Sequence, residues 1–205
     1  MQVVGELAVR VNVAGVGNSG TSSLICRYVH GHYPANQNGL GDYFHTKHVS
    51  IDGKNVGVGI FETILKYRFA TMMPLVFRDS DACALVFSLA SHESFDELKD
   101  FKKVVDRCVE DMPYCYPFVL IGNKSDQWEN RQVSRFEVED WCKKEGICAY
   151  FETSAKTGDI VDKSFEELGR LAVIFKKSKY MMKEQPVVEE SAHESKKSSS
   201  KCIII

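Results

Sequence analysis

A glycine-rich segment between a strand-like run and a helix-like run constrains the fold of this chain more than any other feature. Residues 7–14 are an apolar run typical of a strand, residues 15–22 read Gly-Val-Gly-Asn-Ser-Gly-Thr-Ser, and residues 22–33 show helical periodicity. The segment has the GxxxxGK[ST] frame of a phosphate-binding P-loop, with threonine at the position of the lysine. We therefore expect an α/β fold in which this loop follows a strand and opens a helix.

Short apolar runs alternate with helical segments along the rest of the chain. Five more strands are predicted, at residues 44–51, 56–61, 83–89, 118–121 and 148–151, and Asp52-Gly53 joins the first two as a hairpin. Apolar residues recur at helix spacing in two places, the first after a cap at Ser91; they are Phe95, Leu98, Phe101, Val105 and Cys108, then Phe165, Leu168, Ala172 and Phe175. This alternation predicts a mostly parallel, six-stranded sheet with helices on both faces.

The length of 205 residues suits one domain followed by a tail. We expect the domain to span residues 1–177, because Ser, Lys and Glu dominate residues 178–205, a composition typical of disorder. The net charge of −2 gives no basic field, so nucleic acid is not an expected partner. Seven cysteines without CxxC spacing favour a reducing compartment. Neither a signal peptide nor a membrane-spanning run is visible.

Two motifs downstream of the P-loop have the order and spacing of a guanine-recognition pair. Asn123-Lys124-Ser125-Asp126 and Thr153-Ser154-Ala155-Lys156 each follow a predicted strand directly, and α/β sheets bind ligands at that end of their strands. The Asp126 carboxylate can accept hydrogen bonds from N1–H and the 2-amino group of guanine. Adenine offers neither group, so Asp126 would specify guanine.

The other residues of the two motifs have supporting roles. We expect Asn123 to reach the purine edge and to tie its loop to the P-loop, while the stem of Lys124 covers a ring face. In Ser154-Ala155-Lys156, the backbone N–H of Ala155 is expected to meet the guanine O6, and Lys156 to flank the ring.

With these motifs, the chain resembles a Ras-superfamily small GTPase, and most closely the Rab family. The resemblance covers roughly residues 7–175. Several stretches are similar to the late-endosomal and lysosomal Rab branch, namely residues 44–49, 84–87, 117–119, 129–133, 141–142 and 150–154. The resemblance implies a P-loop G-domain, GTP or GDP and Mg²⁺ as ligands, protein effectors or regulators as partners, and a monomer.

The phosphate-binding half departs from the family pattern at its charged position. The resemblance assigns nucleotide binding here to Gly15, Gly17, Asn18, Ser19, Gly20, Thr21, Ser22 and Ser23. The glycines keep the backbone able to surround phosphates, and Asn18 tolerates unusual φ angles. Thr21 brings no positive charge, and no lysine precedes Lys47, so a shifted alignment does not restore one.

The positions that would hold Mg²⁺ and sense the γ-phosphate are altered as well. The resemblance assigns Ser22 and Glu62 to Mg²⁺, and Glu62 is one methylene longer than the family's aspartate. Gly39 stands at the position of the switch I threonine, and Leu65 and Lys66 stand at those of the switch II glycine and glutamine. We expect impaired hydrolysis, because charge neutralisation and water orientation are nearly the whole of phosphoryl-transfer catalysis.

Nucleotide binding is expected to weaken without vanishing. A charge-assisted hydrogen bond contributes roughly 1.5–3 kcal/mol. The contacts of the P-loop lysine, of the switch I threonine with Mg²⁺ and of the switch II glycine are all lost, which removes roughly 4–9 kcal/mol of binding free energy. That loss corresponds to on the order of three to six decades of affinity. Without γ-phosphate sensors, GTP and GDP have little differential affinity for two states. An alternative in which Lys66 folds back onto the phosphates would restore an active GTPase, so enzymatic activity stays open here.

The last four residues, Cys202-Ile203-Ile204-Ile205, have the form of a CaaX box, the acceptor of a prenyl group on Cys202. One prenyl chain anchors weakly, and the nearby Lys196, Lys197 and Lys201 offer a second, electrostatic signal. We expect a location in the cytosol and on the cytoplasmic face of an endosomal or other intracellular membrane.

Two hypotheses of different kinds remain. The first is a membrane-anchored, Rab-like guanine-nucleotide-binding protein of vesicle traffic, with impaired hydrolysis and switching. The second is a nucleotide-independent pseudoGTPase that acts as a scaffold at a membrane. The guanine motifs favour the first, and the altered phosphate contacts favour the second.

Overall fold

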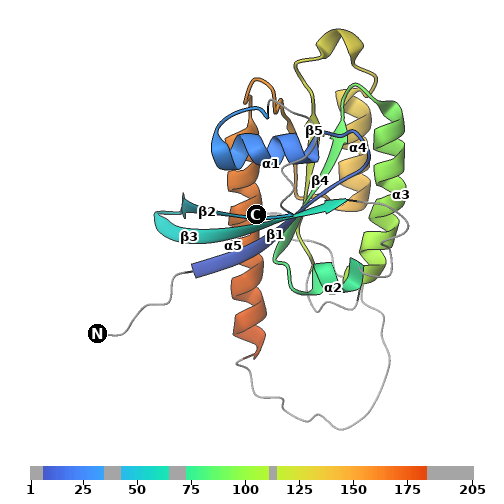
Figure 1. Ribbon diagram of the computed structural model, residues 1–205. Coiled ribbons are helices and arrows are strands. Elements are labelled where there is room, and N and C mark those ends of the chain that lie inside the picture. Colours follow the sequence, from blue (N-terminus) through green and yellow to red (C-terminus); the bar gives the residue numbers. More distant parts are fainter. Residues whose placement is uncertain (1–6, 35–42, 65–72, 111–114, 184–205) are drawn as a thin grey trace, which may run out of the picture.

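The computed structural model describes residues 7–34, 43–64, 73–110 and 115–183. They form a six-stranded sheet of order β2-β3-β1-β4-β5-β6 (Figure 1). Only β2 and β3 pair antiparallel, so the predicted α/β class and mostly parallel sheet are confirmed. The strands are β1 (Leu7–Gly15), β2 (Phe44–Ile51), β3 (Lys54–Ile64), β4 (Ala82–Ser88), β5 (Phe118–Asn123) and β6 (Ala149–Glu152).

The helices lie on both sides of the sheet (Figure 1). They are α1 (Thr21–His30), α2 (Met73–Arg78), α3 (His92–Val109), α4 (Arg135–Glu145) and α5 (Val161–Lys183), with a short 3₁₀ helix, η2 (Trp128–Asn130), before α4. In the described part of the chain, no helix has both the length and the apolar composition needed to cross a membrane.

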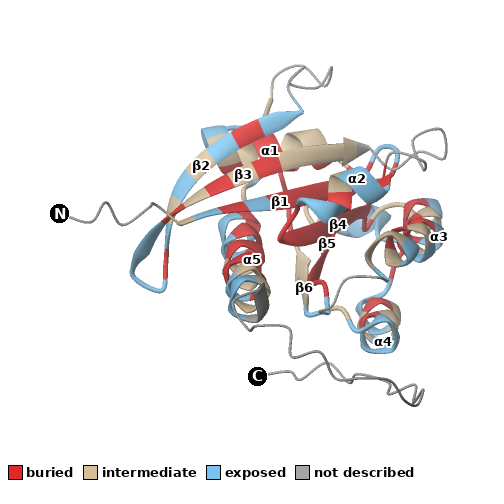
Figure 2. Ribbon diagram, turned by 90° about the horizontal axis from the view of Figure 1, so that it is seen from below, coloured by how far each residue is buried: buried red, intermediate tan, exposed pale blue. Residues whose placement is uncertain are grey.

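Side-chain alternation along the strands divides the core into two halves, one on each face of the sheet. In β4, residues 82, 84 and 86 belong to the half that contains α1 and most of α5, whereas residues 83, 85 and 87 belong to the half formed with α2, α3 and α4. All of β4 is buried, as its red colour in Figure 2 shows. Of the predicted helix stripes, Phe95, Leu98, Phe101, Val105, Phe165, Leu168, Ala172 and Phe175 are buried, and Cys108 is partly buried.

Local turn chemistry sets several of the element ends. Asp52 and Gly53 both have positive φ, 49° and 72°, as a two-residue hairpin of type I′ requires. The Ser91 side chain accepts a hydrogen bond from the Ser94 N–H, so the predicted cap of α3 is confirmed. Helix α1 ends at His30 instead of residue 33, because Gly31 adopts a φ of 75° and its N–H meets Arg27 O.

Helix α5 continues to Lys183, six residues beyond the predicted domain end at 177. The segment past 177 contains lysines and methionines that favour helix, and the loss of an apolar stripe there reflects exposure and not the end of the helix. Tyr180 and Met181 are indeed 58% and 70% exposed.

A buried polar network fixes α2 to the middle of the sheet. Asn12 lies in β1 with 1% of its surface exposed, and its Nδ2 donates to Val76 O at 3.3 Å and to Ser80 Oγ at 3.0 Å. Ser80 Oγ also donates to Phe77 O and pairs with the Tyr116 hydroxyl. Burial raises the pKa of Tyr116 well above its ordinary value, so the hydroxyl stays protonated within the network.

Candidate functional site

The P-loop (residues 15–22) connects β1 to α1 in a backbone conformation suited to anions. Asn18 and Gly20 have φ angles of 57° and 82°, so the tolerance expected of Asn18 is used. Gly20 is the N-cap of α1 and makes no side-chain cap hydrogen bond, which leaves the first-turn N–H groups available to a ligand. A hollow of about 330 Å³ lies over the loop; it is lined by Gly15, Val16, Gly17, Asn18, Ser19, Gly20, Thr21, Ser22, Ser23, Tyr33, Glu62, Thr63 and Lys124.

Thr21 turns its hydroxyl into the P-loop. Its Oγ1 lies 2.9 Å from Ser19 Oγ, which donates to Val16 O at 2.8 Å. Only 8% of Thr21 is exposed, and a Cβ built on Gly15 would lie 1.8 Å from its Oγ1. The residue at the lysine position therefore packs across Gly15 and satisfies the loop's own oxygens. It brings neither charge nor reach to a phosphate.

The two residues assigned to Mg²⁺ bind each other. Ser22 Oγ donates to Glu62 Oε1 at 2.5 Å. Burial raises the pKa of the Glu62 carboxyl, while the Ser22 hydrogen bond and the charge of His45 oppose the rise.

The chemistry of this pair suits Mg²⁺ better than its spacing does. Mg²⁺ takes oxygen ligands at about 2.0–2.1 Å in octahedral geometry, which separates neighbouring ligand oxygens by about 2.9 Å. Ser22 and Glu62 are closer than that. The described residues contain no group of three or more His, Cys, Asp or Glu side chains placed to hold a metal ion. Both side chains offer oxygen donors of the kind that Mg²⁺ takes, and their mutual hydrogen bond would have to open before both could ligate the same ion.

Asn123 lies at the centre of the guanine side, the part of the site formed by residues 123–126 and 153–156, and it ties these two motifs to the P-loop. Its Nδ2 donates to Ser19 O of the P-loop at 2.9 Å, so the expected tie is present. Its Oδ1 accepts from the Ala155 N–H at 3.1 Å and from Thr153 Oγ1 at 3.4 Å. With 1% of its surface exposed, Asn123 fixes the relative positions of both guanine motifs and the P-loop. The Ala155 N–H, expected to meet the guanine O6, points to Asn123 here.

Lys124 and Asp126 flank this centre. Lys124 Nζ donates to Asn18 O at 2.6 Å, which ties the first guanine motif to the P-loop. Burial lowers the pKa of Lys124, and the nearby Asp126 carboxylate opposes that shift. Ser154 Oγ donates to Asp126 Oδ1 at 2.6 Å. This hydrogen bond orients the carboxylate that is expected to specify guanine.

Arg27 is a site residue that sequence reasoning missed. Its guanidinium extends from α1 and donates from Nε to Ala155 O at 2.8 Å, from Nη2 to Lys156 O at 2.6 Å and from Nη1 to Gly31 O at 2.9 Å. Lys156 itself is exposed. Nothing in a helical pattern tells which arginine will reach a loop 128 residues away, so the sequence offered no signal for this contact.

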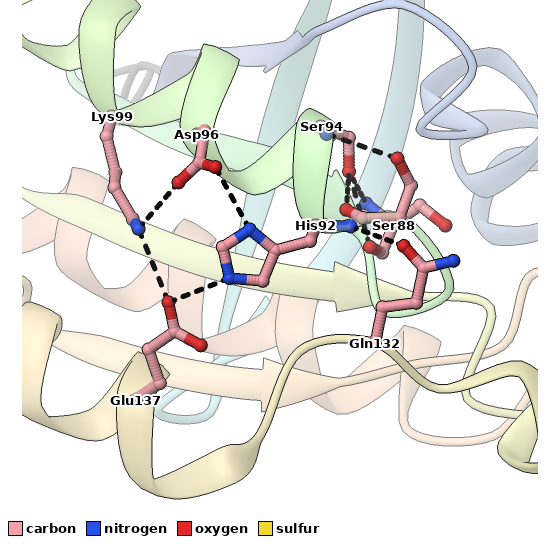
Figure 3. A network of polar contacts seen from close by, with 8 residues as sticks. Ser88, His92, Ser94, Asp96, Lys99, Gln132 and Glu137 are labelled. Atoms are coloured by element: carbon pink, nitrogen blue, oxygen red, sulfur yellow. Dashed lines mark hydrogen bonds and ion pairs between the residues drawn. The ribbon is translucent and has the colours of Figure 1, made fainter.

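A polar network lies at the start of α3 (Figure 3), and through Leu89 it contacts Asn123 at the end of β5. The Leu89 N–H donates to Asn123 O, and Leu89 O accepts from the Gln132 N–H. The Gln132 side chain in turn accepts from the His92 N–H. The His92 ring lies between Asp96 and Glu137, with Nδ1 3.0 Å from one carboxylate and Nε2 3.2 Å from the other. Helices α3 and α4 are thereby joined behind the guanine side.

The structure thus brings the P-loop, Glu62 and both guanine motifs to the carboxyl edge of the sheet. The sites expected at Gly39, Leu65, Lys66 and Cys202 lie outside the described residues.

Comparison with known proteins identifies similar chains. A family model described as Ras family matches residues 10–174. The chain is 35% identical to human Ras-related protein Rab-9A over 197 residues, which is 94% of this chain and 96% of that protein. It is 35% identical to human Ras-related protein Rab-9B over 168 residues, with 80% and 83% coverage. It is also 32% identical to GTP-binding protein yptV5 of Volvox carteri over 167 residues, with 80% and 82% coverage.

Proposed function

We propose that this chain, which belongs to the Ras family of small GTPases and to its Rab group, binds guanine nucleotides weakly. We propose further that it does not hydrolyse GTP efficiently and does not change conformation between its GDP and GTP complexes. Its proposed setting is vesicle or endosomal traffic. The observation that supports this most directly is the contrast between an assembled guanine side around Asn123 and a P-loop in which Thr21 replaces the lysine.

The guanine side supports retained base selectivity. Asp126 is oriented by Ser154, and both motifs are connected to the P-loop through Asn123 and Lys124. A buried side chain with every polar atom satisfied is costly to disturb. The guanine loops therefore stay in place without a ligand to hold them.

The phosphate side supports weak binding with little Mg²⁺ dependence. Phosphate contacts would come from the N–H groups of the P-loop and the first turn of α1, without a lysine charge from position 21. Ser22 and Glu62 would be the residues to hold Mg²⁺, which when bound neutralises phosphate charge. Their mutual hydrogen bond competes with that role.

Impaired hydrolysis and switching follow from the residues at the sensing positions. Gly39 has no hydroxyl to hold Mg²⁺ as the family's switch I threonine does. Lys66 stands at the position of the glutamine that orients the attacking water and has no amide to do so, and Leu65 replaces the neighbouring glycine. A nucleotide shifts a conformational equilibrium only by its differential affinity for the two states. We therefore propose nearly equal affinities for GDP and GTP.

The proposed location is the cytosol and the cytoplasmic face of an endosomal membrane, with a prenyl group on Cys202 as the anchor. Effectors or regulators would bind the G-domain surface there. The nearby lysines 196, 197 and 201 would add electrostatic attraction to anionic lipids.

The first experiment is a titration of the purified protein with fluorescent GDP and GTP, in Mg²⁺ and then in EDTA, with ATP as competitor. Guanine-selective binding with similar GDP and GTP affinities and a small effect of EDTA is expected. A strong preference for GTP, or binding that depends on Mg²⁺, would contradict the proposed lack of switching.

A nucleotide-independent pseudoGTPase scaffold is the second candidate. It is favoured by the internal pairing of Thr21 with Ser19 and of Ser22 with Glu62, which leaves these side chains satisfied without a ligand. The Asp126→Ala variant separates the two candidates. Loss of guanine preference supports nucleotide binding, whereas an absence of nucleotide binding in the native protein up to millimolar concentrations supports the scaffold.

A further inference from the structure

We infer that Arg27 is a positioning residue for guanine recognition: its guanidinium sets the conformation of the Ser154-Ala155-Lys156 loop and, through it, the orientation of Asp126. The inference rests on the proposed guanine binding and extends it to a residue outside every nucleotide-binding motif. Arg27 lies in the second turn of α1, on the helix that the P-loop opens. It therefore connects the phosphate side to the guanine side.

The first step is the hydrogen bonding of the Arg27 guanidinium to the Ser154-Ala155-Lys156 loop. Nε and Nη2 donate to the consecutive carbonyls of Ala155 and Lys156, and Nη1 donates to Gly31 O at the end of α1. A planar guanidinium presents donors in a fixed fork, so three acceptors in these positions define one orientation of the loop relative to the helix. An ammonium group is a compact point charge and cannot reproduce that fork.

The second step runs from the loop backbone to Asp126. The C=O and N–H of a trans peptide point in opposite directions, and the described residues contain no cis peptide. Because Lys156 O points to Arg27, the N–H of Thr157 points away from it, and this N–H donates to Ser154 Oγ at 3.1 Å. The same hydroxyl donates to Asp126 Oδ1 at 2.6 Å. One continuous chain of contacts thus joins Arg27 to the carboxylate that would read the 2-amino group.

The opposite side of the loop is held independently. The Ala155 N–H donates to Asn123 Oδ1, and the Gly158 N–H donates to Ser154 O at 2.8 Å. Removal of the Arg27 hydrogen bonds therefore leaves a folded loop that these other contacts still hold. The expected loss is in the orientation of Asp126 and not in the fold.

The test compares Arg27→Gln and Arg27→Lys with the native protein. GDP and inosine diphosphate are the probes, because the latter lacks only the 2-amino group. Arg27→Gln should lower GDP affinity about tenfold, the effect of one lost charge-assisted hydrogen bond, and should reduce the preference for GDP over inosine diphosphate. Arg27→Lys should not restore that preference. A purely structural role would leave the ratio of the two affinities unchanged, and that result would overturn the inference.

The matched control is Arg170→Gln. Arg170 also donates from two guanidinium nitrogens, but to Glu167 on the surface of α5, so its loss should leave both affinities within about twofold, as for other surface changes. A drop in preference in this control as large as in Arg27→Gln would also overturn the inference.

A ligand-free measurement separates this inference from the proposed function. Amide exchange of residues 155–158 should accelerate in Arg27→Gln and Arg27→Lys and stay unchanged in Arg170→Gln, while circular dichroism confirms folding. If the native protein binds no guanine nucleotide, the proposed function fails, and the exchange measurement still decides whether Arg27 positions residues 155–158. Unchanged exchange in both Arg27 variants would show that it does not.

Discussion

At the scale of single residues, Ile160 is held in a conformation that its side chain disfavours. It has a φ of 58°, in the left-handed region where a β-branched residue is a genuine outlier. The residue precedes α5 directly, and the Ser164 N–H donates to its carbonyl in the first turn of that helix. The strain is therefore imposed by the junction between the second guanine loop and α5.

Replacement of Ile160 by Asn should stabilise the domain by about 1 kcal/mol, because Asn tolerates left-handed backbone that costs most L-residues about 1–2 kcal/mol. The control is Ile174→Asn in α5, since both isoleucines are 47% exposed and residue 174 lies within a regular helix. Urea unfolding measures both variants. A gain in the control, or a loss of stability in Ile160→Asn, would contradict the strain argument.

Thr21 offers the second prediction at this scale. The Thr21→Lys variant should bind GDP about 10- to 100-fold more tightly, because a charged hydrogen bond to phosphate is worth roughly 1.5–3 kcal/mol. Thr21→Val removes the hydroxyl without adding charge and should bring no gain. Fluorescent GDP titration of the native protein and both variants provides the measurement. Equal affinities for the native protein and Thr21→Lys would mean that the P-loop cannot direct a lysine at the phosphates.

Among elements, β6 and the segment that leads into α4 are held together by one bidentate ion pair. Arg131 donates to both oxygens of Glu152, at 2.8 and 2.7 Å, and the Tyr150 hydroxyl donates to one of them at 2.9 Å. The Arg131 hydrogen bonds hold the pKa of the Glu152 carboxyl below its usual range, and burial only partly offsets them.

This pair should make stability depend on pH in a defined direction. The folded-state pKa of Glu152 lies below its unfolded value, so its contribution is full above the unfolded value, about 4.3, and is lost as pH falls through the folded value. Glu152→Gln should therefore cost about 1 kcal/mol at pH 7, and the difference from the native protein should shrink below about pH 4. Urea unfolding from pH 7 to 3 measures it. Glu129→Gln, an exposed change in η2, should show neither effect, and a constant difference for Glu152→Gln across the range would refute the assignment.

The elements also show what a sequence can and cannot give. Six strands, the Asp52-Gly53 hairpin and the cap at Ser91 were predictable, because each rests on local periodicity or turn chemistry. Helices α2 and α4 were not predicted from a stripe, because α2 has only six residues and the apolar Phe136 of α4 faces solvent, 82% exposed, instead of the core. The tie from Asn123 to the P-loop was expected from its motif, whereas the contacts of Arg27 and the Ser22–Glu62 pairing depend on tertiary placement.

At the scale of the whole molecule, the chain beyond α5 carries the proposed membrane signal. Replacement of Cys202 by Ser should remove the prenyl mass and shift the protein from the membrane to the soluble fraction, because the thiol is the acceptor. Mass spectrometry and fractionation of expressing cells measure the two effects. Cys148→Ser, which changes an exposed cysteine of the folded domain, is the control, and membrane binding that persists in Cys202→Ser would rule out the anchor.

The ties that brace the nucleotide pocket also set when it can form during synthesis. Residues 18–20 are joined to residues 123–124, more than 100 positions later, and Arg27 is joined to a carbonyl 128 positions later. A ribosome adds about 5–20 residues per second, so the P-loop waits roughly ten seconds for its partners after it emerges. The pocket can close only after residues 123–156 have been made, so a nucleotide cannot assist the folding of the first half of the nascent chain.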